Sequence, residues 1–356
     1  MAYTIPVERT KAAKSKPSED QLVFGKYYTD HMFILDYDTE NGWHDPRITP
    51  YQPLVLDPAA KVFHYGQSIF EGLKAYRTED GRILMFRPDM NAKRLNQSNY
   101  RMCIPPIDEE MFHEALQALL QVDQDWIPST EGTSLYIRPF VIATQPNLGV
   151  APSTKYRFMI ILSPVGSYYA EGIHPVKIFV ESEYVRTVKG GTGMAKTAGN
   201  YAASLVAQQE ANKVGYTQVL WLDALHGKYI EEVGSMNVFF KINGIVVTPA
   251  LTGSILNGIT RDSVIHLLQE WGVPVEERQV SIDELYKAHL DGTLEEAFGT
   301  GTAAVISPIG EMRWGDKVIP INNGETGEIS SKVYDTITGI QYGTIEDPFN
   351  WVVELK

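Results

Sequence analysis

Apolar residues in the first half of the chain form short runs that predict strands, together with one segment of helical spacing. The predicted strands are residues 32–37, 82–86, 136–142 and 156–163, which are rich in Ile, Leu, Val and aromatic side chains. Residues 110–123 instead repeat apolar side chains every three or four positions, which is the spacing of one helix face. The first half is therefore expected to be mainly strands, with at least one amphipathic helix.

The second half mixes strands and helices without a regular order. The pattern predicts strands at residues 176–183, 218–222 and 236–242, and helices at residues 201–214 and 261–271. Ser281 to Glu284 has the form of a capping box and predicts the start of another helix. Because strands and helices do not alternate as in βαβ units, the predicted fold class is α+β.

Length and turn-forming residues divide the chain into two predicted domains. A chain of 356 residues exceeds the size at which one hydrophobic core usually stops growing. Residues 166–175 combine Gly, Ser and Pro without periodicity, so we expect the interdomain loop there. This gives a small α+β domain at residues 22–165 and a large one at residues 176–356. The polar residues 1–21 are interpreted as an arm that is mobile or draped over the surface.

Charge and cysteine content exclude several classes of function. The formal net charge of -13 disfavours binding to a phosphate backbone, so no nucleic-acid partner is expected. Cys103 is the only cysteine, which excludes an intrachain disulfide and a cysteine-based metal site, and no metal is expected. The first twenty residues lack the apolar centre of a signal peptide, and no run approaches the ~20 apolar residues that span a bilayer. We expect a cytoplasmic protein without a membrane partner.

Lys196 and Glu232 are the first candidates for chemistry. Lys196 lies among small residues that would let another molecule approach, as a lysine used for covalent chemistry requires. Glu232 lies before an apolar strand, where its carboxylate could pair with a buried cationic ring nitrogen. Taken alone, each window also fits a bland interpretation, namely a lysine on a surface loop and a solvated glutamate. The neighbouring Glu231 is interpreted as solvated.

Two turns and two arginines could bind anions. Leu256 to Thr260 precedes a predicted helix, whose first amides and positive dipole end favour a negative charge. The Gly299 to Ala304 turn could present its amides to a second anion. Arg138 lies in an apolar strand and therefore predicts a carboxylate or phosphate partner, although an internal ion pair is also common. Arg94 could equally be an arginine on a helix surface.

Together these segments resemble the branched-chain amino-acid aminotransferases, which are fold-type IV pyridoxal-phosphate enzymes. The matching motifs are His64-Tyr65-Gly66 with Phe70-Glu71-Gly72, Gly132 to Pro139, Gly190 to Tyr201, Glu232 to Asn237, and Gly299 to Ala303. They occur in the family's order and extend over nearly the whole chain. The longer form found in animals and many bacteria is the most similar.

The resemblance implies a role for each candidate residue. Lys196 would carry pyridoxal 5'-phosphate covalently and later move the proton, Glu232 would pair with the ring nitrogen, and Tyr201 would donate to the ring's phenolic oxygen. Arg94 and the amides of Ile259 and Thr260 would hold the phosphate, and the cofactor would also contact Ser235, Leu256 and Thr302. The apolar substrate pocket would be lined by Phe24, Phe70, Tyr136, Val150 and Tyr168, the amides of Thr302 and Ala303 would take the α-carboxylate, and Arg138 and Tyr65 would serve the distal carboxylate of glutamate.

The implied activity is reversible transfer of the amino group of leucine, isoleucine or valine to 2-oxoglutarate, in two half-reactions of a ping-pong cycle, by a homodimer. One departure is that Ala304 and Ser307 replace the redox cysteines of the animal enzymes. Alternatives are a D-amino-acid aminotransferase or an aminodeoxychorismate lyase of the same fold. Another is a binding protein for a phosphorylated metabolite, which would leave Lys196 and Glu232 unexplained.

Overall fold

A computed structural model describes residues 4–166 and 173–356 of the chain. Its contacts divide into two compact units, each with its own sheet and core. The first unit comprises Met1–Tyr168, Ala195–Ala198 and Gly339–Lys356, and the second comprises Tyr169–Met194 and Gly199–Thr338. The α+β fold class is confirmed, because each unit combines a sheet with helices rather than repeating βαβ units.

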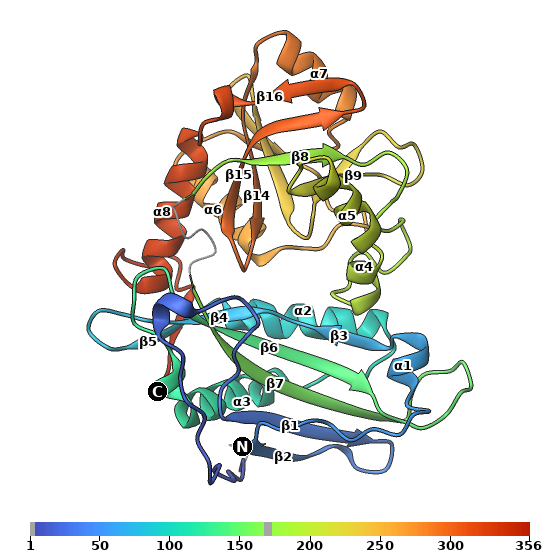
Figure 1. Ribbon diagram of the computed structural model, residues 1–356, viewed down its shortest axis with the longest axis vertical. Coiled ribbons are helices and arrows are strands. Elements are labelled where there is room, and N and C mark those ends of the chain that lie inside the picture. Colours follow the sequence, from blue (N-terminus) through green and yellow to red (C-terminus); the bar gives the residue numbers. More distant parts are fainter. Residues whose placement is uncertain (1–3, 167–172) are drawn as a thin grey trace. The chain divides into compact units, whose positions relative to one another are not determined.

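The first unit is built on one antiparallel sheet (Figure 1). Its strand order is β17-β5-β4-β6-β7-β1-β2, and β3 also pairs with β6. The strands are β1 (His31–Asp38), β2 (Gly42–Pro50), β3 (Ser68–Phe70), β4 (Leu73–Arg77), β5 (Ile83–Phe86), β6 (Ser134–Ala143), β7 (Lys155–Val165) and β17 (Val352–Glu354). The four strands predicted in this half are confirmed.

Two helices pack on one face of this sheet and form the first core. They are α2 (Pro88–Arg101) and α3 (Glu109–Val122), whose apolar side chains join Phe33, Leu73 and Ile137 in one buried cluster. Asp108 caps α3 by accepting hydrogen bonds from the amides of its first turn. The remaining short helical segments of this unit are η1 (Glu19–Gln21), α1 (Lys61–Tyr65) and η2 (Gln124–Trp126).

The second unit has a mixed sheet in the order β10-β9-β8-β15-β14-β11-β12-β13, and β16 pairs with β15. The strands are β8 (Val176–Val180), β9 (Gln218–Leu222), β10 (Ile230–Val233), β11 (Asn237–Ile242), β12 (Ile245–Thr248), β13 (Val275–Glu277), β14 (Leu294–Gly301), β15 (Val305–Trp314) and β16 (Lys317–Pro320). The helices are α4 (Ala198–Ala202), α5 (Leu205–Lys213), α6 (Ile259–Glu270), α7 (Ile282–Leu290) and α8 (Glu328–Tyr342), with η3 at Asn322–Gly324. Two of these helices, α4 and α8, extend across the boundary between the units.

Most of the strands and helices predicted in the second half of the chain are confirmed. Ser281 caps α7 and accepts a hydrogen bond from the amide of Glu284 at 3.0 Å. The predicted helix at 201–214 is wrong as a single helix, because a turn at Ala203 and Ser204 separates α4 from α5. In the first half of the chain, the helix α2 was not among the predicted elements.

The C-terminal residues belong to the first unit, whereas the sequence analysis placed them in the second domain. The reason is strand pairing: β17 pairs with β5, and Val352 lies opposite Phe86. Residues 195–198 also join the first unit. The interdomain loop expected at residues 166–175 falls mostly on residues outside the described part of the chain.

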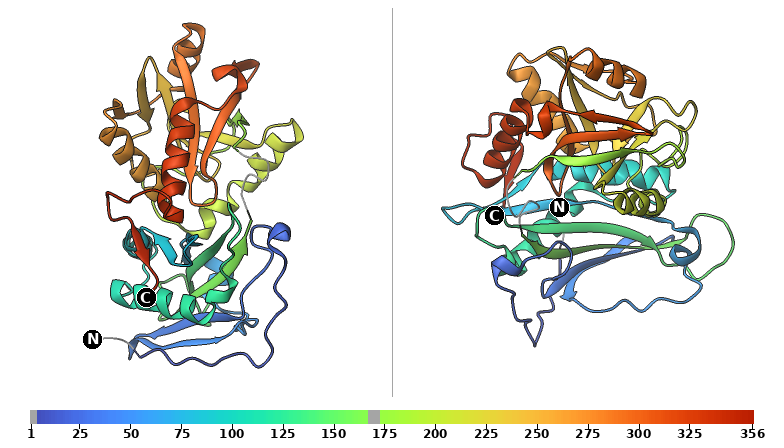
Figure 2. Two further views of the ribbon diagram at one scale, coloured as in Figure 1. Left: turned by 90° about the vertical axis from the view of Figure 1, so that its left-hand side faces the viewer. Right: turned by 45° about the horizontal axis from the view of Figure 1, so that its top comes forward.

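The described part of the N-terminal arm is draped along the first unit (Figure 2). Val7 bridges to Ile48, and the amide of Thr10 donates to Nε2 of His31 at 2.9 Å. Further along, Glu19 accepts hydrogen bonds from the amides of Ser129 and Thr130. No helix among the described residues is long and apolar enough to cross a membrane.

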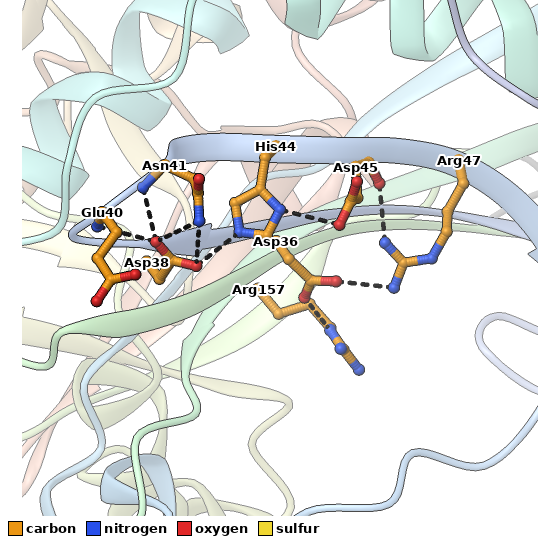
Figure 3. Close-up of polar contacts among 8 residues, drawn as sticks. All are labelled: Asp36, Asp38, Glu40, Asn41, His44, Asp45, Arg47 and Arg157. Atoms are coloured by element: carbon orange, nitrogen blue, oxygen red, sulfur yellow. Dashed lines mark hydrogen bonds and ion pairs between the residues drawn. The ribbon is translucent and has the colours of Figure 1, made fainter.

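A charged cluster on β1, β2 and β7 contains a histidine between two carboxylates (Figure 3). Nε2 of His44 lies 3.0 Å from Asp38, and its Nδ1 lies 3.0 Å from Asp45. Desolvation by itself would lower the pKa of His44, but the hydrogen bonds and charges of Asp45 and Asp38 outweigh it and raise that pKa above its ordinary value. Beside this group, Asp36 pairs with Arg47 and Arg157.

We expect His44→Gln to destabilise the protein below neutral pH only. A raised folded-state pKa contributes stability that is complete below the unfolded pKa and is lost as pH rises through the folded pKa. For an exposed pair the effect is ~0.2–1 kcal/mol. Thermal melting of wild type and variant should therefore differ at pH 6 and coincide at pH 9. A difference that is the same at both values would contradict this assignment.

Candidate active site

Lys196 is held by backbone hydrogen bonds on both sides of its segment. Its amide donates to Oγ of Ser98 on α2 at 2.9 Å, and its carbonyl accepts from the amide of Phe70 on β3 at 2.9 Å. The next residue, Thr197, donates its hydroxyl to the carbonyl of Ser68 at 2.7 Å. The lysine amine lies 5.0 Å from the centroid of the Phe70 ring. Lys196 is therefore a fixed, partly buried residue rather than a lysine on a free surface loop.

A buried carboxylate, Glu71, lies directly after Phe70 and is fully shielded from solvent. Nε and Nη2 of Arg94 donate to its two oxygens at 2.8 Å each, and Nδ2 of Asn91 donates at 2.8 Å. Burial alone would raise the pKa of Glu71. The charge and hydrogen bonds of Arg94, followed by the charge of Lys196, override that effect and hold the pKa below its usual range. Arg94 is thus a buried helix residue, not a surface one, and its guanidinium engages Glu71.

Arg138 lies among aromatic rings, and the described residues provide no ion-pair partner for it. Its Nη2 donates to the Tyr136 hydroxyl at 3.0 Å, and its guanidinium carbon lies 4.8 Å from the Phe70 ring centroid. Its Nε is buried and has no hydrogen-bond partner among the described residues. The alternative of an internal ion pair is therefore not supported by the described residues. An anion entering beside Phe70 and Tyr136 would satisfy this buried donor.

Gly72 makes room for the Tyr136 hydroxyl. A Cβ atom on Gly72 would lie 2.0 Å from that oxygen, well inside contact distance. Phe24 packs edge-on against Tyr136 with ring centroids 4.9 Å apart. The first unit thus places Lys196, Phe70, Tyr136 and Arg138 in one contact network and includes Phe24.

Two other expected pocket residues lie on the surface of the chain. Tyr65 is 40% exposed and donates its hydroxyl to the carbonyl of Leu148, and Val150 is 86% exposed. Neither has the burial expected of a residue that lines a closed apolar pocket. Tyr168 lies outside the described residues.

In the second unit, Glu232 is buried at 3% exposure and has three hydrogen-bond donors. Nε of Arg186 donates to Oε2, whereas the Leu256 amide at 3.0 Å and Nδ2 of Asn237 at 3.4 Å reach Oε1. The interpretation of Glu232 as a solvated strand-end glutamate is therefore excluded. The sequence analysis did not single out Arg186.

The interpretation of Glu231 as solvated is wrong. Glu231 is 8% exposed, and its carboxylate accepts a hydrogen bond from the Ser254 hydroxyl. Burial raises the pKa of Glu231, an effect that the Ser254 hydrogen bond only partly opposes. Successive residues of a strand face opposite sides, and both sides of β10 are covered, so both glutamates are buried.

The start of α6 carries the predicted first anion cradle. Gly258 is its N-cap and supplies no side-chain hydrogen bond, which leaves the first turn, with Ile259 and Thr260, without a side-chain cap. Asn237 fixes the preceding loop, because its Nδ2 donates to the Leu256 carbonyl at 2.9 Å. Opposite Asn237 in the sheet, Thr300 is 2% exposed, and its hydroxyl has no hydrogen-bond partner among the described residues.

The second predicted turn joins β14 to β15. Gly301 pairs with Val305, so Thr302 and Ala303 lie at the tip with Ala304, and all three are at most partly exposed. Val305 has a φ of 61°, and the Ile306 amide donates to the Ala304 carbonyl at 2.8 Å, which together make a strained three-residue turn. Of the remaining predicted cofactor residues, Tyr201 lies partly buried on α4, and Ser235 lies exposed between β10 and β11.

Comparison with known proteins identifies the family of this chain. The sequence model described as "Amino-transferase class IV" matches residues 68–312, and the chain belongs to that family. It is 66% identical to "Branched-chain-amino-acid aminotransferase 2" of Bacillus subtilis (strain 168), over 99% of this chain and 97% of the relative. It is 60% identical to "Branched-chain-amino-acid transaminase 1" of the same strain, over 100% of both chains.

Solved structures give the same result for the fold. The branched-chain aminotransferase of Thermoproteus uzoniensis with norvaline has a TM-score of 0.77 at 26% identity, covering 92% of this chain and 100% of the other. The enzyme from Thermobaculum terrenum in its PLP form has a TM-score of 0.75 at 26% identity, covering 91% and 98%. The predicted fold-type IV architecture is confirmed by these neighbours.

We expect Gly72→Ala to destabilise the protein by about 1–3 kcal/mol, the usual cost of overpacking a filled site. The added methyl group must displace the Tyr136 hydroxyl and its hydrogen bond with Arg138. Gly199→Ala is the matched control, because nothing lies within 4 Å of its Cβ position. Thermal melting should separate the two variants. Equal melting points for Gly72→Ala and wild type would contradict the close packing described here.

Proposed function

We propose that the chain transfers the amino group of leucine, isoleucine or valine to 2-oxoglutarate, with pyridoxal 5'-phosphate as cofactor. The observation that carries the proposal is Lys196, which is fixed by backbone bonds to β3 and α2 with its amine beside Phe70. The full-length relatives named as branched-chain aminotransferases support the same activity.

The donor set suits this cofactor. An aldehyde needs a primary amine, a pyridinium nitrogen needs a carboxylate, and a phosphate needs free amides at a helix start. Lys196, Glu232 and the first turn of α6 offer these three groups. The buried hydroxyl of Thr300, which has no hydrogen-bond partner in the described part of the chain, adds a polar atom beside Asn237. When bound, the cofactor would accept the electron pair that is left when the substrate's α-hydrogen is removed as a proton.

The protein residues supply binding, orientation and proton movement. Nζ of Lys196 would hold the cofactor covalently and would move the substrate's α-proton. Glu232 would pair with the ring nitrogen, and the amides of Ile259 and Thr260 would hold the phosphate. Arg94 donates to Glu71 through Nε and Nη2, and by the resemblance it would also contact the phosphate.

The first unit supports recognition of two unlike side chains. Phe24, Phe70 and Tyr136 offer apolar area to a branched aliphatic chain, worth ~25 cal/mol per Å2 buried. Arg138, whose buried Nε has no partner among the residues that the structure describes, would offer a charge to the distal carboxylate of glutamate or 2-oxoglutarate. The turn amides of Thr302 and Ala303 would hold the α-carboxylate that all substrates share.

A homodimer in the cytoplasm completes the proposal. Tyr65 and Val150 match pocket residues of the family but are exposed on this chain. A second copy that covers this surface would bury them, and each copy would then complete a pocket of its partner. Size-exclusion chromatography with light scattering tests the dimer.

The activity is tested by a substrate screen with 2-oxoglutarate as the acceptor. Leucine, isoleucine and valine should each yield glutamate, whereas D-amino acids should not. Purified protein should bind the cofactor and absorb visible light. A colourless protein that pyridoxal 5'-phosphate leaves unchanged would overturn the proposal and favour a metabolite-binding protein.

Lys196→Ala should abolish covalent attachment of the cofactor and nearly all turnover, because it removes the amine that would form the covalent bond. Absorption spectroscopy and the transamination assay measure both effects. Lys189→Ala is the matched control, since Lys189 is an exposed lysine of the same segment. Turnover near the wild-type level in Lys196→Ala would rule out this role for the lysine.

Arg138→Gln should slow the 2-oxoglutarate half-reaction selectively. Charged hydrogen bonds are worth ~1.5–3 kcal/mol, which is roughly a tenfold to hundredfold change in affinity. Leucine has no distal carboxylate, so its half-reaction should change much less. Single-turnover kinetics keep the two halves separate. If both halves fall equally, Arg138 organises the site in general, and if neither falls, the distal carboxylate binds to other groups such as Tyr65.

A further inference from the structure

Arg186 forms a buried ion pair with Glu232. The side chains are 9% and 4% exposed, and Nε of Arg186 donates to Oε2 of Glu232. The other oxygen, Oε1, accepts from the Leu256 amide and from Asn237, and both of these donors are uncharged. Arg186 is therefore the cation that balances this carboxylate among the residues the structure describes.

The same arginine also binds backbone that leads toward Lys196. Its Nη2 donates to the Gly193 carbonyl at 3.2 Å, and Gly193 stands three residues before Lys196 in the sequence. A Cβ atom on Gly193 would lie 2.1 Å from the Ser254 carbonyl oxygen, so this backbone packs closely against the loop that contains Leu256. One guanidinium thus joins three pieces of chain: β10 through Glu232, its own segment, and the segment that ends at Gly193.

A buried carboxylate with one charged and two neutral donors has a defined orientation. Carboxylate oxygens together accept about four hydrogen bonds, so room for one more donor remains on Glu232. The ion pair with Arg186 fixes the orientation of the Glu232 carboxylate. That orientation determines where the remaining acceptor position of the carboxylate points. Removing one partner of a buried pair leaves an uncompensated charge, which is costly.

We propose that Arg186 is a positioning residue that orients and charge-balances Glu232 for the ring nitrogen of the cofactor. The inference rests on the proposed function and deepens it. Arg186 itself does not contact the cofactor in this scheme, because its effect passes through Glu232. It follows that the consequence of losing Arg186 must depend on the presence of the Glu232 carboxylate.

The test is a double-mutant cycle on cofactor binding by the apoenzyme, read from absorption titrations with pyridoxal 5'-phosphate. Arg186→Met should weaken binding about tenfold to hundredfold, the usual cost of losing a residue that orients a ligand. Arg186→Lys keeps the positive charge but loses the planar guanidinium with its several N–H donors, and should weaken binding less than Arg186→Met does. In a Glu232→Gln background, Arg186→Met should have little further effect.

Two controls separate positioning from general damage. Pyridoxal without its phosphate should lose affinity by the same factor in Arg186→Met, because the effect acts on the ring nitrogen. Arg157→Met removes an ion pair with Asp36 elsewhere in the chain and should leave cofactor binding unchanged. Melting of every variant, measured without cofactor, checks that it is folded.

The outcomes are distinct. Independent effects of Arg186→Met and Glu232→Gln, which multiply in the double variant, would overturn the positioning role, as would wild-type binding by Arg186→Met. If wild-type apoenzyme does not bind pyridoxal 5'-phosphate at all, the proposed function itself fails, and this inference fails with it.

Discussion

The buried carboxylate of Glu71 is the interaction on which the arrangement around Lys196 depends. A charge without solvent is tolerated only when it is paired and hydrogen-bonded, and Arg94 and Asn91 of α2 provide both conditions. The pair fixes α2 beside the turn from β3 to β4. Those two elements then supply the groups that hold Lys196, namely the Ser98 hydroxyl and the Phe70 amide. Loss of Glu71 would remove the carboxylate that Arg94 engages and loosen the helix that carries Ser98.

The sequence predicted the elements whose buried faces are apolar. The strands β1, β6 and β7 and the helix α3 have continuous or periodic apolar residues, and each was expected at nearly its observed bounds. The helix α2 could not be found in this way, because Asn91, Arg94, Ser98 and Asn99 occupy part of its buried face. Asn91 and Arg94 bind Glu71, and Ser98 binds the Lys196 amide, so these buried polar contacts remove the apolar pattern that would reveal the helix.

The residues of the candidate site were also only partly predictable from local sequence patterns. Arg138 was predicted to have an anionic partner because an arginine in an apolar strand is locally unusual, and the structure shows no internal carboxylate beside it among the described residues. Glu231 was misjudged, because burial on both faces of β10 depends on covering elements distant in sequence. Arg186 and Glu232 are paired across 46 positions of sequence, and nothing in either local window indicates the other. The resemblance to a family named functional residues but not the residues that support them.

The strand β17 gives the chain an order of assembly. The first unit begins with the N-terminal arm, yet its edge strand consists of residues 352–354, at the far end of the sequence. The second unit is inserted between, and on a ribosome all of its residues emerge before β17 does. Until then β5 has an open edge, which is the kind of surface that pairs with other chains. The newly made protein must therefore pass through a stage in which its first sheet is incomplete.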